Sequence, residues 1–152
     1  MYKPKLKYYF IKTIKVPLWK KLLILEIVLL LTLTRICIII FPFKTIVGFI
    51  NKDKKLKQNH TNDKLAVLVG YLIRKLSERT PWESACLVQA LTGKIMLQRR
   101  GLYSTIYLGL NKESNSMKAH AWLKYQDTII TGDNNGCYRE FSVIKSFGDK
   151  NR

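Results

Sequence analysis

The stretch KAHAWLKYQDTIITGD, residues 118–133, decides the fold. It contains two runs rich in aromatic, aliphatic and β-branched residues, 118–125 and 128–132, which only Gln126 and Asp127 separate. Two such runs joined by a two-residue loop predict an antiparallel β-hairpin. A β-sheet is therefore expected in the C-terminal part of the chain.

The hairpin gives one of the chain's two histidines a defined position. Strand alternation puts His120 and Trp122 on the same face, while the alanines beside His120 point to the other face. With a two-residue loop, His120 lies directly opposite Asp133, where a carboxylate can orient the imidazole. This pairing depends on register, because a shift of one residue turns every side chain to the opposite face.

The rest of the chain adds helices before the hairpin and strands around it. Apolar residues at helical spacing predict helices over 64–77 and 79–101. β-Branched and aromatic residues predict further strands over 102–110 and 138–147. Helices followed by an antiparallel sheet predict an α+β fold.

The helix over 79–101 carries a candidate nucleophile, Cys86. Thr80 as the N-cap places Cys86 in the second turn, whereas Ser84 as the N-cap makes it the second helical residue, where the helix dipole lowers a thiol pKa more. The sequence does not decide between Thr80 and Ser84 as the N-cap. A cysteine, a histidine and an aspartate in this order suit nucleophile, base and orienting group. A buried structural cysteine is the alternative.

Three further residues have two interpretations each. Trp122 either lines a substrate cleft or fills the core. Arg99 and Arg100 either bind a peptide carboxylate or complement the C-terminal helix dipole.

Residues 22–41, LLILEIVLLLTLTRICIIIF, form a long apolar run that Pro42 ends. Its length suits a membrane-spanning helix, but Glu26 and Arg35 interrupt it and lie on opposite faces of the helix. We expect a mostly buried helix, or one that packs on a partner or lies on a membrane surface. The composition divides the chain into a basic N-terminal segment, 1–57, and a core, 58–152.

The net charge of +17 indicates an anionic partner. No nucleic-acid-binding module is present, so we expect no nucleic-acid partner. Three widely spaced cysteines make a poor disulfide framework, which favours the reducing cytoplasm. No C-x-x-C or H-x-x-x-H pair and no nucleotide-binding motif occurs, and we expect neither metal nor cofactor.

Four segments, PWESACLVQAL, LQRRG, LGL and KAHAWLKY followed by TGD, together resemble the leader peptidases of lasso-peptide biosynthesis. These enzymes belong to the transglutaminase-like cysteine protease superfamily, and the resemblance covers about residues 20–147. It implies a papain-like core with Cys86 as nucleophile, His120 as base and Asp133 as the group that orients the histidine. Asn134 is the second choice for the orienting role.

The resemblance also implies a function and partners. It implies removal of the leader from a ribosomally made precursor peptide by a stand-alone peptidase. A separate leader-recognition protein and an asparagine-synthetase-like macrolactam cyclase would act with it. Two alternatives remain open: an acyltransferase or transglutaminase that uses the same three residues, and a basic membrane-associated scaffold whose cysteine and histidine are structural.

Overall fold

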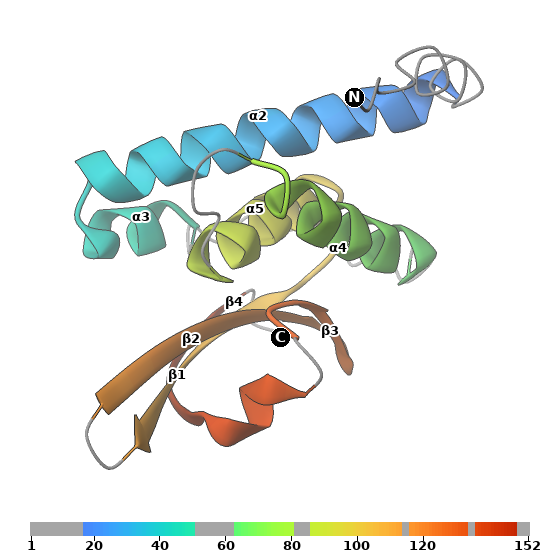
Figure 1. Cartoon of the computed structure of the whole chain (residues 1–152). Helices are drawn as coiled ribbons and strands as arrows, with labels where there is room; N and C mark the ends of the chain where they lie inside the picture. The colour runs from blue at the N-terminus through green and yellow to red at the C-terminus, as the bar shows by residue number, and fades with distance from the viewer. Residues whose placement is uncertain (1–16, 51–62, 81–85, 114–115, 134–135, 149–152) are drawn as a thin grey trace, which may run out of the picture.

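The computed structural model describes residues 17–50, 63–80, 86–113, 116–133 and 136–148. Figure 1 shows a long helix on one outer side, shorter helices beneath it and a sheet below them. The elements are α2 (Leu18–Ile40), α3 (Phe43–Ile50), α4 (Asp63–Ser77), α5 (Cys86–Arg99), β1 (Thr105–Glu113), β2 (Ser116–Tyr125), β3 (Thr128–Thr131), η1 (Cys137–Glu140) and β4 (Ser142–Gly148). The predicted α+β order is confirmed.

The sheet is antiparallel with strand order β3-β2-β1-β4. The chain must therefore cross from the β3 edge to the opposite edge before β4 begins. It does so along the face away from the helices, where η1 lies below the sheet (Figure 1). The prediction of one strand over 138–147 was wrong in its first part. Gly136, with φ +82, turns the chain into the 3₁₀ helix η1, and the strand starts only at Ser142.

The predicted register of the β2–β3 hairpin is correct only near the loop. Tyr125 pairs with Thr128 and Lys124 with Ile129, as a two-residue loop requires. The register then shifts, so that Leu123 pairs with Thr131. The extra residue of this bulge is Ile130, which is buried between the sheet and α4.

The core is built around α5, which packs between the sheet and α2. On the sheet side, Leu91 and Leu97 of α5 join Ile106 and Leu123 in one buried cluster. On the other side, Met96 meets the second cluster, which contains Leu23, Ile27 and Leu31 of α2 and Val69 and Ile73 of α4. One face of the apolar run 22–41 is therefore part of the core. The division of the chain near residue 57 stays a prediction.

Two polar contacts fix α2 on α5. The Glu26 carboxylate forms ion pairs with Arg99, at 3.3 Å, and with Arg100. The hydroxyls of Thr34 and Thr92 share a buried hydrogen bond of 2.9 Å. The acidic residue that interrupts the apolar run thus has its partners on another helix.

Tyr125, which links β2 to α4, makes the folded protein less stable at alkaline pH. Burial, followed by the hydrogen bond that Tyr125 donates to Asp63, raises the pKa of Tyr125 above its usual value. The neutral phenol is thus favoured in the folded protein. The contribution of the Tyr125 phenol to the free energy of unfolding is fully present below the pKa of an unfolded tyrosine, about 10. It is lost as pH rises through the pKa of Tyr125 in the folded protein.

We expect Tyr125→Phe to cost about 1 kcal/mol of unfolding free energy at neutral pH and to flatten the loss of stability above pH about 10. Urea unfolding at a series of pH values measures both effects. Tyr71→Phe, on the exposed side of α4, is the matched control. Parallel pH profiles for wild type and Tyr125→Phe would contradict the assignment.

Candidate functional site

The thiol of the candidate nucleophile lies at the start of α5 as the structure describes it. Cys86 is the first residue of that helix, and its partly buried side chain packs against the cluster between α5 and the sheet. Residues 81–85 lie outside the described part of the chain, so the choice between Thr80 and Ser84 as the cap stays a prediction.

The imidazole of His120 is held by the backbone at the end of the hairpin. Its Nε2 lies 2.7 Å from the carbonyl oxygen of Gly132. A carbonyl oxygen can only accept, so Nε2 carries the proton and the neutral ring keeps its lone pair on Nδ1. A histidine in this tautomer can act as a base through Nδ1.

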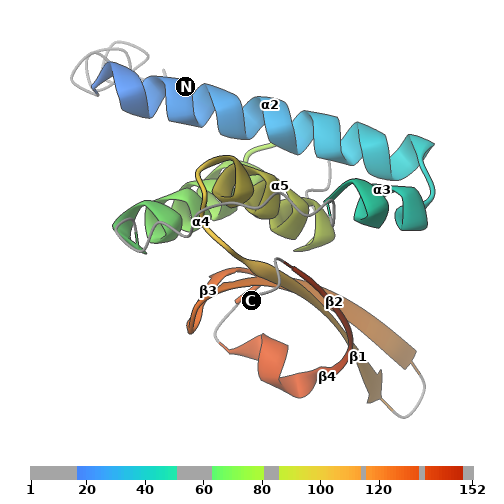
Figure 2. The same ribbon diagram turned by 180° about the vertical axis from the view of Figure 1, so that it is seen from behind.

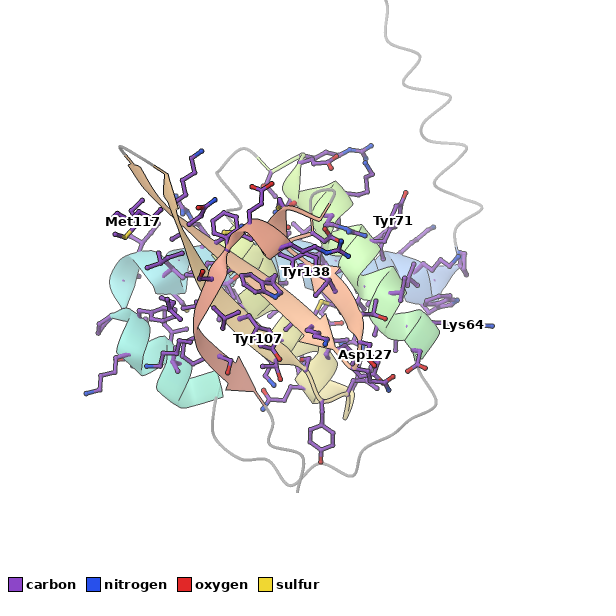
Figure 3. The ribbon with its side chains drawn as sticks, turned by 90° about the horizontal axis from the view of Figure 1, so that it is seen from below. Lys64, Tyr71, Tyr107, Met117, Asp127 and Tyr138 are labelled. Atoms are coloured by element: carbon purple, nitrogen blue, oxygen red, sulfur yellow. The ribbon has the colours of Figure 1, made fainter. Side chains whose placement is uncertain are left out.

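Aromatic rings pack around this imidazole on the sheet face that η1 covers. The ring of Phe141 lies 5.0 Å from it, and that of Trp122 lies 6.0 Å from it, centroid to centroid. The Trp122 ring lies 5.8 Å from that of Tyr107 and 6.0 Å from that of Tyr138. Figure 3 labels both tyrosines. Alternation along β2 sends Ala121 and Leu123 to the opposite face, into the core against α5.

One cleft of about 270 Å³ has both Cys86 and His120 in its lining. These two residues are far apart in sequence and line the cleft from α5 and β2, and the His120 imidazole itself is directed to the η1 side of β2. The other lining residues are apolar or glycine: Phe43, Leu87, Leu108, Gly109, Leu110, Ala119, Ala121 and Ile144. Within the described residues, no hydrogen bond joins the Cys86 thiol to His120. Catalytic hydrogen bonds often form only once substrate is bound.

Asp133 does not sit where the hairpin predicted it. The bulge shifts the register and β3 ends at Thr131, so the predicted pairing of Asp133 with His120 is wrong. The Asp133 carboxylate instead accepts a hydrogen bond of 2.6 Å from the backbone N–H of Gly136 and closes the turn before η1. The acceptor that meets the imidazole is the carbonyl of the preceding residue. Asn134 lies outside the described residues.

Comparison with known families decides the fold family. Residues 31–146 match the model of the transglutaminase-like superfamily. The chain belongs to this superfamily. No curated protein and no solved structure was found to match it.

Members of the transglutaminase-like superfamily are typically enzymes that use a cysteine, a histidine and an aspartate. Membership therefore points to a cysteine-dependent hydrolase or transferase. Membership in the superfamily does not indicate which substrate the protein acts on. Cys86 and His120 lie in one cleft in the order the superfamily uses, and the catalytic role of both stays a prediction, as does that of Asp133.

None of the three residues predicted to bind substrate is among those that line the cleft. Trp122 is 4% exposed and fills the layer between β2 and η1. Arg99 and Arg100 lie at the far end of α5, about 20 Å from Cys86 along the helix axis. Both pair with Glu26, and Arg100 also donates to the carbonyl of Met96, 3.0 Å away.

Two groups beside the imidazole were not predicted from the sequence. Gly132 has φ +83, and a Cβ there would lie 2.5 Å from the Ala121 carbonyl, so only glycine fits this turn. The thiol of Cys137 lies 3.9 Å from His120 Nε2 and 3.9 Å from the Gly132 carbonyl oxygen. The Thr-Gly-Asp turn signal could have drawn attention to Gly132, whereas nothing local marks Cys137. Among the described residues, no three metal-ligating side chains come together.

We expect neutral His120 to be the Nε2–H tautomer, because the Gly132 carbonyl accepts from that nitrogen. The ¹⁵N chemical shifts of the imidazole nitrogens distinguish the two tautomers. His60→Gln removes the signal of the other histidine and so assigns the spectrum. A protonated Nδ1 on the neutral ring would contradict the assignment and remove the base from the position proposed below.

Proposed function

We propose that the protein is a cysteine peptidase that removes the leader from a ribosomally made lasso-peptide precursor. One observation carries the proposal: Cys86 and His120 line the same cleft in a chain of the transglutaminase-like superfamily. The motifs around both residues, Ser-Ala-Cys-Leu and Ala-His-Ala-Trp, are those that resemble the lasso-peptide leader peptidases.

The chemistry begins with proton transfer from the Cys86 thiol to Nδ1 of His120. The thiolate then attacks the carbonyl carbon of the last leader residue. Backbone N–H groups near Cys86 would stabilise the oxyanion. The imidazolium returns its proton to the departing nitrogen, so the core peptide leaves with a free amino terminus. Water hydrolyses the remaining leader thioester, which restores the thiol and gives the leader a carboxyl end.

The residues that line the cleft favour one type of substrate residue beside the scissile bond. Leu108 and Leu110 of β1 and Ile144 of β4 line the cleft with Cys86. These side chains offer apolar contacts and no charge, so they suit an uncharged residue beside the scissile bond. Charged positions of a leader would need another binding surface, which fits the proposed separate leader-recognition protein.

Further partners follow from the same proposal. The free amino terminus made by cleavage is the nucleophile that a macrolactam cyclase requires, so an asparagine-synthetase-like cyclase would act next. We propose that all three proteins work in the cytoplasm. Asp133, with Asn134 as the second choice, would support His120 indirectly, through the turn that presents the Gly132 carbonyl.

The test is mass spectrometry of a linear precursor peptide incubated with its recognition protein and this protein. A peptidase gives two fragments whose masses add up to the precursor plus one water. A transglutaminase gives a cross-linked product that has lost ammonia, and an acyltransferase gives a product enlarged by the acyl group. An unchanged precursor, with the recognition protein bound and this protein folded, would favour the scaffold alternative.

A further inference from the structure

The outward face of α2 is a continuous apolar surface. Six side chains form it at intervals of three or four residues, with exposed fractions from 45% to 71%: Leu18, Leu22, Leu25, Leu29, Leu33 and Ile36. We call this set the apolar stripe. In Figures 1 and 2 α2 forms one outer side of the molecule, and no described element lies over it. An exposed apolar surface of this length marks a place of contact.

The inward face of the same helix is committed to the protein core. Ile27 and Leu31 are fully buried, and Glu26 pairs with Arg99 and Arg100. By length and composition alone α2 could cross a membrane. A crossing would strip this face of its core partners and place Glu26 in hydrocarbon. A helix with one face in the core and the other in lipid instead lies in the membrane plane.

The charge of the chain indicates what kind of partner surface the apolar stripe contacts. The chain carries a net charge of +17, and Lys20, Lys21 and Lys44 flank the stripe along the chain. Residues 1–16 add five lysines and no acidic residue. Basic residues beside an apolar helix face attract anionic lipid headgroups. A second copy of the chain would bring two strongly positive molecules together, which disfavours dimerisation through the stripe.

A groove at the C-terminal end of α2 also suits lipid. It has a volume of about 290 Å³ and lies between α2, α3 and α5. Cys37 and Phe41 line it from the α2 side, Ile46 from α3, and Leu91 and Ile95 from α5. The lining has no charged side chain, so it fits an acyl chain better than a polar peptide.

We propose that the apolar stripe docks on an anionic lipid bilayer, with α2 lying in the plane of the interface. The stripe would sit among the acyl chains, and the lysines would lie at the headgroups. Trp19 and Phe41 are half-exposed near the two ends of α2, at positions that suit aromatic residues at a membrane interface. This inference is independent of the proposed peptidase function.

The test is flotation of the full chain with phosphatidylcholine vesicles, prepared with and without phosphatidylglycerol. We expect binding to the anionic vesicles that weakens as salt rises. The triple variant Leu25→Ser, Leu29→Ser, Leu33→Ser should bind these vesicles at least about tenfold more weakly. Val67→Ser with Tyr71→Ser is the matched control, because both side chains are 51% exposed on α4, and its binding should equal that of wild type.

A second variant keeps the test decisive if the triple variant does not fold. Lys20→Gln, Lys21→Gln and Lys44→Gln should weaken binding to the anionic vesicles and leave any binding to neutral vesicles unchanged. Circular dichroism and thermal melting establish folding. The proposal is overturned if wild type stays unbound with anionic vesicles, or if folded stripe variants float like the control. A dimer in sedimentation velocity that the stripe variant dissolves, together with no flotation, would assign the stripe to a second copy.

Discussion

We expect Cys86→Ala to abolish the proposed leader removal, with a loss of about 10⁴-fold or more in the rate of precursor cleavage. An alanine cannot form the thioester, and water alone then has to attack the peptide bond. The fold should persist, because Cys86 is only partly buried and loses a single atom. Mass spectrometry of the precursor over time, with the recognition protein present, measures the rate.

The other cysteines make the test specific. Cys37 lines the groove between α2, α3 and α5, away from the cleft, so Cys37→Ala is the matched control and should cleave at the wild-type rate. Cys137→Ala is a discriminating variant, because the Cys137 thiol lies 3.9 Å from Nε2 of His120. Loss of cleavage in Cys137→Ala with full cleavage in Cys86→Ala would move the nucleophile to η1. Unchanged cleavage in both would exclude thiol catalysis by either.

Gly70→Ala lowers the free energy of unfolding by about 3 kcal/mol. A Cβ on Gly70 would lie 2.4 Å from the carbonyl oxygen of Ile130 and 2.7 Å from its Cγ2. The carbonyl belongs to the backbone of β3, so α4 and the sheet would have to separate to make room. For a chain of this length, we expect a melting temperature lower by roughly 10 °C.

The control for this effect is Gly48→Ala in α3. A Cβ there meets nothing within 4 Å, so the substitution changes helix propensity alone. It should leave the melting temperature unchanged or raise it slightly, since alanine favours a helix by up to about 1 kcal/mol over glycine. Thermal unfolding followed by circular dichroism compares the two variants. Equal melting temperatures for Gly70→Ala and wild type would show that α4 does not approach β3 this closely.

Gly70 illustrates what a local pattern cannot predict. In the sequence it is a weak point of the helix over 64–77, because glycine has poor helix propensity. In the structure it is a point of close approach between α4 and β3. Lys94 is a second case, since a lysine on a helix is expected in solvent. Its side chain is buried, and its Nζ donates to the carbonyl of Ser104 at 2.7 Å.

One part of the candidate site could be predicted from local sequence patterns, and the other part depends on the tertiary structure. The motifs around Cys86 and His120 sufficed to select both residues, because short-range patterns define a helix and a hairpin. The position of Asp133 was mispredicted, because the bulge at Ile130 depends on packing against α4. The Gly132 carbonyl meets the imidazole only after that bulge has formed.

The sequence by itself determined the α+β order, the bounds of α4 and of the β2–β3 hairpin to within two residues, the basic charge and the candidate cysteine and histidine. It did not predict α3. Period-two and helical patterns are local properties, and they follow from side-chain direction along one element. Only the tertiary structure decided the partners of Glu26, the path through η1 and the exposure of one face of α2. These features depend on which elements meet in space. A run that is apolar on all sides, such as 22–41, cannot indicate in advance which face the core will take.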